Sequence, residues 1–479
     1  MKLSAIILLF LNYILFAIAD TDEKLIFLMT HYRHGARAPN KLDDKFLDTL
    51  KEKWTNPGEL TGIGERMHYL LGFRNRKRYI IDKKFLSEKY DPHEILIYSS
   101  FYNRTLVSAS SQLQGFYPQN DGLGEILTEE QKKNAYPQVD TNISGIDEEL
   151  EKLGNCSLPN NIVLTAIRMI NLNERRIRLF ALDDCKDEVD EIKKKNMETV
   201  PNLISFVEEF NNKYGTKINE FEGKSDKKYD ISYMDKFCDS FIADYTEKRP
   251  LTEFKKTGID FKELEEYCHE YSKMNFMYHY SGDKEKIIPH LEASRLMEEF
   301  IYYMQLRIDA DMNGENIDEQ YKDYSKPKML MISAHETTVS LHEMFLMDAL
   351  GLNETFYIFP KFAGQMAFEV TRKNDGPKKS YNDYFINYYF NDKLMLRMPV
   401  QEFIEKVEPH IWSDEKIKDF CGIEDKIIIY RNSTVYEKKK DNAKTAYKVL
   451  MSVFICLSAI LLALVVILGL KLANRPSIK

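Results

Sequence analysis

The sequence predicts an α/β protein in which helices flank a central sheet, a mostly helical segment interrupts the core, and one transmembrane helix follows. Two apolar runs, at 25–30 and 329–333, have the length of buried strands and are bounded by polar residues. Between them, residues 125–290 are rich in Glu, Lys and Leu at helical spacing. Residues 449–470 carry no charge and are long enough to span a bilayer.

The predicted core is divided between two stretches of the chain, 20–124 and 291–430, on either side of the helical segment. The first stretch contains the strand at 25–30 and the helices that follow it. The second contains, in order, the strand at 329–333, two alternating aromatic segments typical of strands at 364–371 and 384–390, and a closing helix at 401–411.

Length and composition are consistent with a globular protein that has a substantial core. A chain of 479 residues, 44% of them hydrophobic, would usually form two domains. The net charge of −8 is mild and offers no basic surface, so nucleic acid is not expected as a partner. The composition does not fix the oligomeric state, and a homodimer is compatible with it.

Both ends of the chain carry targeting signals. Residues 1–19 combine an early lysine, an apolar stretch and small residues before a cleavage point, which predicts a secretory signal peptide. A charged stalk at 431–448 precedes the apolar span, and basic residues in 471–479 follow it, unlike a lipid-anchor signal. The lysines of the stalk would favour the cytosolic side under the positive-inside rule. The predicted orientation nevertheless follows the signal peptide, which directs the residues before the span into the lumen. We expect a single-pass type I membrane protein of the lysosome, another endomembrane lumen or the cell surface, with a cytosolic tail.

The stretch from His31 to Pro39 directly follows the first predicted strand and carries the clearest chemical signal. Ligands of open α/β sheets bind where strands end at their carboxyl edge. Arg33 and Arg37 offer planar guanidinium groups that match phosphate oxygens. His34, held between them, is a candidate nucleophile toward phosphorus.

The longer pattern Arg33-His34-Gly35-Ala36-Arg37-Ala38-Pro39 resembles the signature of the histidine acid phosphatases. Three further matches follow in the family's order: 60–79 resembles its first long helix, Asn103-Arg104-Thr105 the segment with another phosphate-binding arginine, and 329–338 its second catalytic strand end, with His335 and Glu336. His34 and His335 can meet only if the strands at 25–30 and 329–333 lie close together in one sheet. The resemblance implies a Rossmann-like sheet whose active-site edge is covered by a cap.

Carried over by position, the resemblance implies a role for each site residue. His34 attacks phosphorus and forms a phosphohistidine, and Glu336 protonates the leaving group. The phosphoryl oxygens are held by Arg33, Arg37, Arg104 and His335. Neither a metal nor another cofactor is implied, and the substrates are small-molecule phosphomonoesters.

Two departures from the family pattern affect this reading. Glu336 stands where most members have aspartate, which keeps the acid and lengthens its arm. Residues 98–101 read Tyr-Ser-Ser-Phe where the family usually has Arg-Ser-Thr-Asp, so the support of Arg104 is in question.

The nucleophilic form of a histidine is the neutral one, and a free imidazole is only roughly 3% neutral at pH 5. We therefore expect the neighbouring arginines to keep His34 in its neutral form.

The cysteines indicate disulfides and not a metal site. Six are present: Cys156, Cys185, Cys238, Cys268, Cys421 and Cys456, the last within the predicted membrane span. None has the spacing of a zinc site, and five in an oxidising lumen leave at least one outside an intrachain pair. The family resemblance implies a Cys156–Cys421 disulfide, and Cys238 is left with Cys185 or Cys268. Glycosylation sequons begin at Asn103, Asn142, Asn155, Asn353 and Asn432.

Three functional readings remain open at this point. The first is an acid phosphatase of the lysosomal, type I membrane kind. The second is an inositol-polyphosphate or lysophosphatidate phosphatase on the same fold, although the inositol-polyphosphate enzyme should need a strongly basic cap, whereas the lumenal domain is acidic. The third is a catalytically degraded receptor-like ectodomain, against which the intact histidine and arginine positions argue.

Overall fold

The computed structural model describes most of the predicted core and cap. The described residues are 23–40, 54, 56–119, 123–135, 145–169, 182, 185–197, 201–249, 251–314 and 327–422. The predicted signal peptide at 1–19, stalk at 431–448, membrane span at 449–470 and tail at 471–479 all lie outside them. Across the described ranges, no helix combines the length and the apolar character that crossing a membrane requires.

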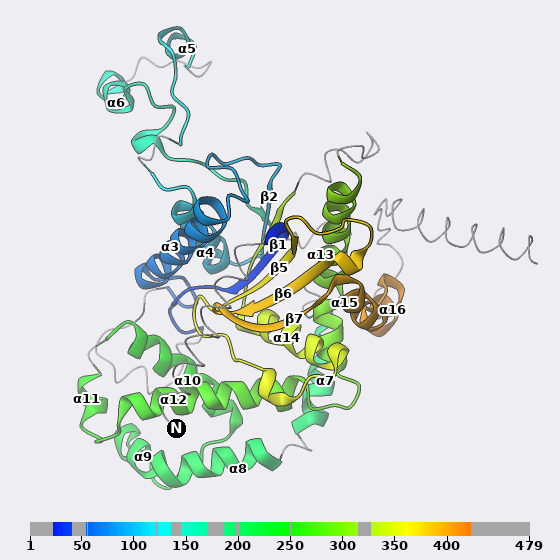
Figure 1. Ribbon diagram of the computed structural model, residues 1–479. Helices are drawn as coiled ribbons and strands as arrows, with labels where there is room; N and C mark the ends of the chain where they lie inside the picture. The colour runs from blue at the N-terminus through cyan, green and yellow to red at the C-terminus, as the bar shows by residue number, and fades with distance from the viewer. Residues whose placement is uncertain are drawn as a thin grey trace, which may run out of the picture. The chain divides into compact units, whose positions relative to one another are not determined.

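A seven-stranded mixed sheet lies at the centre, in the order β3-β2-β4-β1-β5-β6-β7 (Figure 1). The strands are β1 (Glu23–Arg33), β2 (Ile95–Ser99), β3 (Arg168–Met169), β4 (Met329–Ala334), β5 (Gln365–Lys373), β6 (Tyr384–Phe390) and β7 (Lys393–Pro399). β1 to β4 are mutually parallel, whereas β5, β6 and β7 run antiparallel to their neighbours. The predicted α/β class is therefore confirmed, but only half of the sheet is Rossmann-like.

The antiparallel half follows from short connections that cannot cross over a sheet. Only Asn391 and Asp392 separate β6 from β7, and both have positive φ, at 43° and 72°. Such a two-residue turn joins adjacent antiparallel strands, whereas parallel neighbours need a long crossover. The predicted closing helix is α15 (Val400–Val407), which begins directly after β7.

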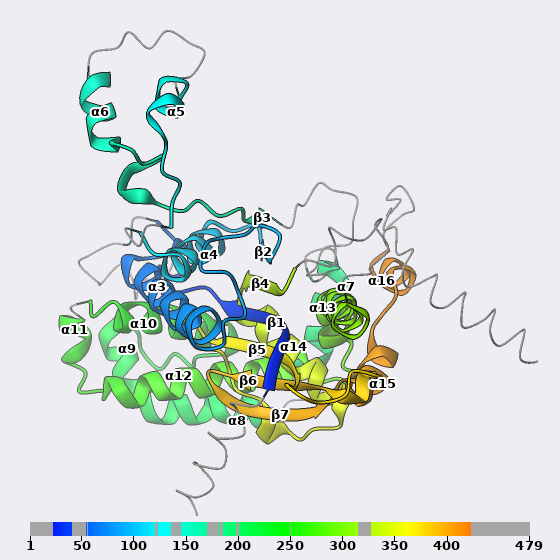
Figure 2. The ribbon, with the colours of Figure 1, turned by 45° about the horizontal axis from the view of Figure 1, so that its top comes forward.

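Helices cover both faces of the sheet (Figures 1 and 2). On one face, α13 (Ile287–Asn313), α14 (Glu336–Leu350) and α15 pack on a cluster that includes Phe27, Phe300 and Phe368. On the other face, α4 (Asn103–Phe116) packs on a cluster with Leu28 and Met331, and α3 (Gly62–Arg76) lies against α4. Because alternate residues of β1 serve the two clusters, this central strand is apolar on both sides, as its sequence suggested.

The parallel pairing of β1 with β4 places the two predicted catalytic segments side by side. The register aligns Arg33 with Ala334, so the residues that follow, His34 and His335, leave the same edge of the sheet. The expectation that strands 25–30 and 329–333 are neighbours is confirmed.

The segment 125–290 divides into two structural parts. Residues 125–135 and 145–161 form an excursion with the short helices α5 (Glu129–Lys133) and α6 (Ile146–Leu153), which both views show well apart from α8–α12 (Figures 1 and 2). The helical cap is built from α7 (Lys186–Met197), α8 (Pro201–Phe210), α9 (Thr216–Glu222), α10 (Ile231–Thr246), α11 (Thr252–Lys255) and α12 (Phe261–Asn275). Helices α8 to α12 surround an aromatic core of their own that includes Phe210, Phe237 and Tyr271.

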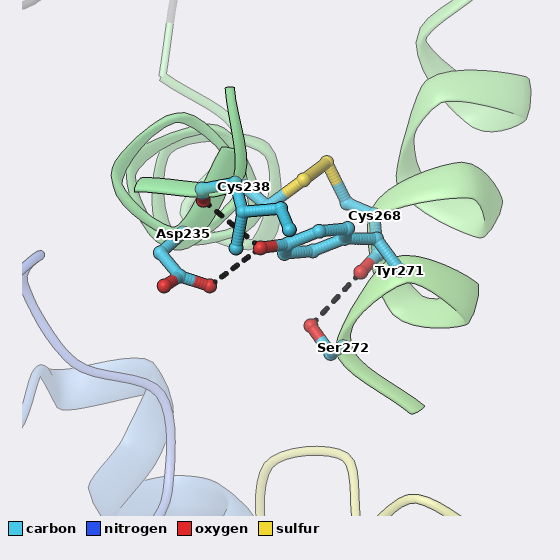
Figure 3. Close-up of a disulfide and its surroundings, with 6 residues drawn as sticks. Asp235, Cys238, Cys268, Tyr271 and Ser272 are labelled. Atoms are coloured by element: carbon cyan, nitrogen blue, oxygen red, sulfur yellow. Dashed lines mark hydrogen bonds between the residues drawn. A yellow bond between two sulfur atoms is a disulfide. The ribbon is translucent and has the colours of Figure 1, made fainter. Parts of the chain in front are cut away.

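A disulfide between Cys238 and Cys268 joins α10 to α12 (Figure 3) and selects between the two partners left open by the sequence. A second disulfide joins Cys185 to Cys421, with Cα atoms 4.7 Å apart, so the predicted Cys156–Cys421 pair is wrong. Cys156 belongs to the excursion, where it pairs in a β-bridge with Ile126, and it is the free cysteine of the described chain. A disulfide therefore does join the cap to the end of the core, but its cap cysteine is Cys185, directly before α7.

Candidate active site

The signature loop leaves the sheet between β4 and β5 and is fixed there by backbone hydrogen bonds. The amide of His34 donates to Ala334 O at 2.9 Å, and that of Arg33 donates to Gly364 O at 3.0 Å. Gly35 then lies against the start of α3, where a Cβ atom would stand 2.4 Å from Gly64 O. Only glycine permits this close approach, which turns the loop and aims His34 back into the site.

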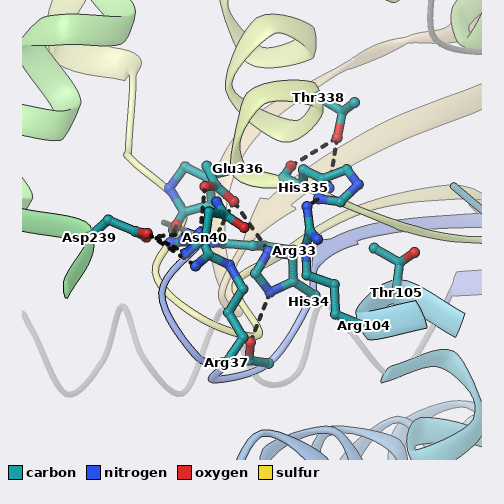
Figure 4. A network of polar contacts seen from close by, with 12 residues as sticks. Arg33, His34, Arg37, Asn40, Arg104, Thr105, Asp239, His335, Glu336 and Thr338 are labelled. Atoms are coloured by element: carbon teal, nitrogen blue, oxygen red, sulfur yellow. Dashed lines mark hydrogen bonds and ion pairs between the residues drawn. The ribbon is translucent and has the colours of Figure 1, made fainter. Parts of the chain in front are cut away.

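His34 is fully buried, and its hydrogen bond identifies the tautomer. Its Nδ1 lies 2.8 Å from the carbonyl oxygen of Gly35, which can only accept, so Nδ1 carries the proton. Nε2 is left with its lone pair, 3.4 Å from Glu336 Oε2 (Figure 4). Burial lowers the pKa of His34 to about 3, with smaller contributions from Arg37 and Arg33, so the ring is neutral at pH 5. The expected neutral form is thus found, although burial and not the arginines is its main cause.

Arg33 and Arg37, which lie at the start of the signature loop and within it, both point toward the carboxylate of Glu336. Arg33 Nε lies 2.9 Å from Glu336 Oε2, and Arg37 Nη2 lies 3.7 Å from Oε1. Arg33 is held by Pro360 O at 3.1 Å and by the Phe362 ring, whose centroid is 4.4 Å from its guanidinium carbon. The Nε of Arg37 has no hydrogen-bond partner among the described residues. These groups form a site for an anion.

His335 and Arg104 complete the cluster, but they contact each other. Arg104 donates from Nη2 to His335 Nδ1 at 3.3 Å, and the other ring nitrogen lies 2.8 Å from Ser100 Oγ. The rings of His335 and His34 meet edge-on, with centroids 5.5 Å apart. Burial, followed by His34 and Arg104, lowers the pKa of His335 well below its usual value. His335 is therefore at the site, with both ring nitrogens engaged.

Ser100 is a site residue that the sequence reading missed. Besides contacting His335, its hydroxyl lies 2.9 Å from Thr105 Oγ1, on the first turn of α4 next to Arg104. The sequence feature that could have revealed Ser100 is its position directly after β2, at the same edge of the sheet as the catalytic loop. The departure at 98–101 therefore does not leave this side of the site unsupported.

Glu336 begins α14, and its charge is set by its neighbours. Burial opposes ionisation, but Arg33, His34 and Arg37 together hold the pKa of Glu336 well below its usual value. The amino end of a helix also favours a negative charge at this position. Glu336 is consequently ionised, and its carboxylate pairs with Arg33 and Arg37 in the structure.

Asp239 of the cap helix α10 is a second missed residue. Its carboxylate accepts from Arg37 Nη2 at 2.9 Å, from Nη1 at 3.3 Å and from the backbone amide of Asn40 at 3.0 Å (Figure 4). No pattern in the sequence distinguishes this aspartate from the other acids of the helical segment. Its place follows only from the docking of the cap on the loop.

A cavity of about 380 Å³ opens from this cluster toward the cap. Its floor includes Arg33, Arg37 and Glu336, and its cap wall includes residues of α10 and α12. The structure thus brings all six predicted site residues together: Arg33, Arg37 and Glu336 line this cavity. Behind them, His34 lies against Glu336, and His335 contacts both His34 and Arg104.

Among the residues that the structure describes, two groups have the composition of a metal site. The ligand atoms of His34, His335 and Glu336 lie within 4.8 Å of one another, but arginines border them, and Arg33 already pairs with the carboxylate. In the second group, His290 uses Nδ1 toward His410 O and Nε2 toward Asp348. The arginines therefore compete with a cation for the first group, and both ring nitrogens of His290 are already engaged in the second. The expectation of a metal-free site stays a prediction.

The fold and the site define an α/β protein with a buried histidine inside an arginine-lined anion site. A family model of the histidine phosphatase superfamily (branch 2) matches residues 24–391, and the chain belongs to this family. The match spans both core stretches and the cap.

Curated relatives include acid phosphatases. Human prostatic acid phosphatase is 25% identical over 82% of this chain and 88% of its own length. The lysosomal acid phosphatase of Xenopus laevis is 40% identical, over 20% of this chain and 22% of its own length. A putative acid phosphatase of Caenorhabditis elegans is 37% identical over 22% of this chain and 26% of that protein. The chain therefore aligns with about a quarter of the last two relatives and with most of the first.

Among solved structures, the apo form of Hafnia alvei phytase has a TM-score of 0.50 at 14% identity, covering 84% of this chain and 98% of the phytase. Klebsiella phytase gives a TM-score of 0.50 at 13% identity, covering 86% of this chain and 98% of its own. At this identity the similarity establishes the fold alone.

Proposed function

We propose that this protein is a metal-independent acid phosphatase that hydrolyses phosphomonoesters through a phosphohistidine. One observation carries the proposal: the unprotonated Nε2 of His34 faces an anion site in which a carboxylate already lies between two buried arginines. A substrate phosphate would take the place of that carboxylate.

In the first step, the phosphate binds Arg33, Arg37 and Arg104, and Glu336 loses its arginine partners. Because burial then dominates, the pKa of Glu336 rises and the carboxyl gains a proton. Nε2 of His34 attacks phosphorus, and the bond from phosphorus to the ester oxygen breaks. The bonding pair leaves with that oxygen, which receives the proton of Glu336.

In the second step, Glu336 is a carboxylate again and serves as the base. It takes a proton from water while the water oxygen attacks phosphorus, and the phosphorus–nitrogen bond breaks. The pair returns to Nε2 of His34, and inorganic phosphate is released. The Nδ1–H bond to Gly35 keeps the ring oriented throughout, as a fixed hydrogen bond does for other catalytic histidines.

The test is hydrolysis of p-nitrophenyl phosphate and glycerol phosphate at pH 5 by the purified protein, with His34→Ala as the inactive control. Turnover by the wild type and none by His34→Ala supports the proposal. Absence of turnover for every phosphomonoester, in a folded protein, would contradict it and favour the receptor-like reading.

We also infer that the catalytic domain faces an endomembrane lumen or the cell exterior and is anchored through 449–470. The two disulfides support an oxidising compartment, and the uncharged stretch supports the anchor. A chain ended after Lys448 should be released in soluble, glycosylated form. Retention of that chain in the membrane fraction would refute this topology.

A further inference from the structure

The cap wall of the cavity is a rigid surface that faces the phosphate site. Helices α10 and α12 are joined by the Cys238–Cys268 disulfide, and Tyr271 donates from its hydroxyl to Asp235 at 2.8 Å (Figure 3). Asn275 donates to the same carboxylate at 3.1 Å. A substrate whose phosphate binds Arg33 and Arg37 has room for its leaving group on this side, because the cavity extends from these arginines to the two helices.

The charges of this wall favour a positive group. Asp235 and Asp239 lie one helical turn apart on α10, and both line the cavity. Lys236 also lines it, and the side chains of Lys236 and Asp235 are both exposed, whereas Asp239 is half-buried. The aromatic ring of Phe276 adds a face that attracts cations. Because Asp239 contacts Arg37, it is the cap charge nearest to a phosphate bound by the arginines.

Asp239 is the cap carboxylate that contacts the anion site directly. It shares the Arg37 guanidinium with the anion site, so it lies within one guanidinium width of a bound phosphate. A carboxylate has about four acceptor positions, and Arg37 and Asn40 use three in the structure. A nitrogen two carbons from the ester oxygen can reach this carboxylate while the phosphate remains bound.

We propose that Asp239 is a specificity-determining residue that selects phosphomonoesters with an ammonium group on a short leaving group and rejects leaving groups that carry further anions. The inference rests on the proposed function and deepens it. It also separates this enzyme from polyphosphate hydrolysis, because the additional phosphates of such a substrate would face the carboxylate of Asp239 across the cavity.

The experiment compares three leaving groups of similar size and different charge at pH 6: O-phosphoethanolamine, n-propyl phosphate and phosphoglycolate. For the wild type, kcat/KM should be roughly tenfold higher for phosphoethanolamine than for phosphoglycolate, with the propyl ester between them. Attraction of one substrate and repulsion of the other each contribute a few-fold at a partly exposed carboxylate. The difference should appear mainly in KM, since the charge contact is made in both ground and transition states.

The matched variants are Asp239→Asn and Asp147→Asn, which remove the same charge from the cap wall and from the exposed, distant helix α6. Asp239→Asn should reduce the tenfold ratio to less than threefold, and Asp147→Asn should keep it. Equal kcat/KM for the three esters in an active wild type, or an unchanged ratio in Asp239→Asn, would overturn the specificity proposal alone. No hydrolysis of any of the three, nor of p-nitrophenyl phosphate, would instead overturn the proposed function.

Discussion

Substitution of Glu336 by glutamine separates anion binding from proton uptake. The carboxylate pairs with Arg33 at 2.9 Å and Arg37 at 3.7 Å, so any anion that enters must replace it. A dianion at about 4 Å would repel an ionised Glu336 by several kcal/mol at an effective dielectric constant of 20. Protonating the carboxyl costs about 1.4 kcal/mol for each pH unit above its pKa. From the ordinary carboxyl pKa of about 4.3, this cost is about 4 kcal/mol at pH 7. It is smaller than the repulsion by a dianion, so binding should take up one proton.

The sign of the pH dependence follows from this linkage. Glu336 has a lowered pKa in the free protein and a higher one in the complex, so the affinity is greatest at low pH. It should fall about tenfold per pH unit as the pH rises, which amounts to roughly 100-fold between pH 5 and 7. In Glu336→Gln this dependence should nearly disappear, and at pH 7 the variant should bind the anion more tightly than the wild type.

Calorimetric titration with sulfate measures this directly, because sulfate does not titrate in that range. The control is Asp235→Asn, since desolvation raises the pKa of Asp235 to about 6 and this carboxyl also lines the cavity. A wild-type slope that persists in Glu336→Gln and vanishes in Asp235→Asn would refute the reasoning. Glu336→Gln should also slow transfer of the phosphoryl group from glycerol phosphate to His34 by roughly 10²–10³-fold while largely sparing the same step with p-nitrophenyl phosphate, whose leaving group hardly needs a proton.

Three further predictions concern the support of the site and the fold. Ser100→Ala removes the hydroxyl that contacts one ring nitrogen of His335 and should lower kcat/KM about tenfold. The control is Ser99→Ala, which should not lower it, because the Ser99 hydroxyl donates to the backbone carbonyl of Ser100 and not to His335. Equal loss in the two variants would contradict the positioning role of Ser100. Burial lowers the pKa of His68 to about 4, so the unfolded chain binds its proton first as the pH falls below about 6.5. Urea unfolding should therefore lose about 2 kcal/mol more between pH 7 and 5 in the wild type than in His68→Gln, and parallel losses would count against this. Cys185→Ser opens a loop of 236 residues and should lower the unfolding free energy by up to about 5 kcal/mol, whereas Cys156→Ser should leave it unchanged, and the reverse pattern would restore the original pairing.

The sequence predicted the central part of the site because its residues occur in short contiguous motifs at strand ends. Arg33, His34 and Arg37 follow β1, and His335 and Glu336 follow β4, so pairing of two parallel strands is enough to assemble them. Because β1 and β4 are parallel, two motifs whose histidines lie 301 residues apart in the sequence form one site.

Asp239 and the Cys185–Cys421 pair could not be predicted in the same way. Asp239 reaches Arg37 only because the whole cap docks on the signature loop, and an aspartate on an amphipathic helix has no distinguishing local pattern. The disulfide error arose because α5 and α6 form a separate excursion, which removes Cys156 from the end of the core. The antiparallel pairing of β6 with β7 depends on the two-residue turn at Asn391 and Asp392, a signal that the alternating strand pattern does not include.

Identification of the phosphorylated atom tests the central claim most directly. The wild type is mixed with a ³²P-labelled phosphomonoester at pH 5, quenched in alkali within milliseconds, digested and mapped. The account predicts a phosphoramidate on Nε2 of His34, because Nδ1 is occupied by its proton and its bond to Gly35. Label on Nδ1, on His335 or on any serine or aspartate would contradict it.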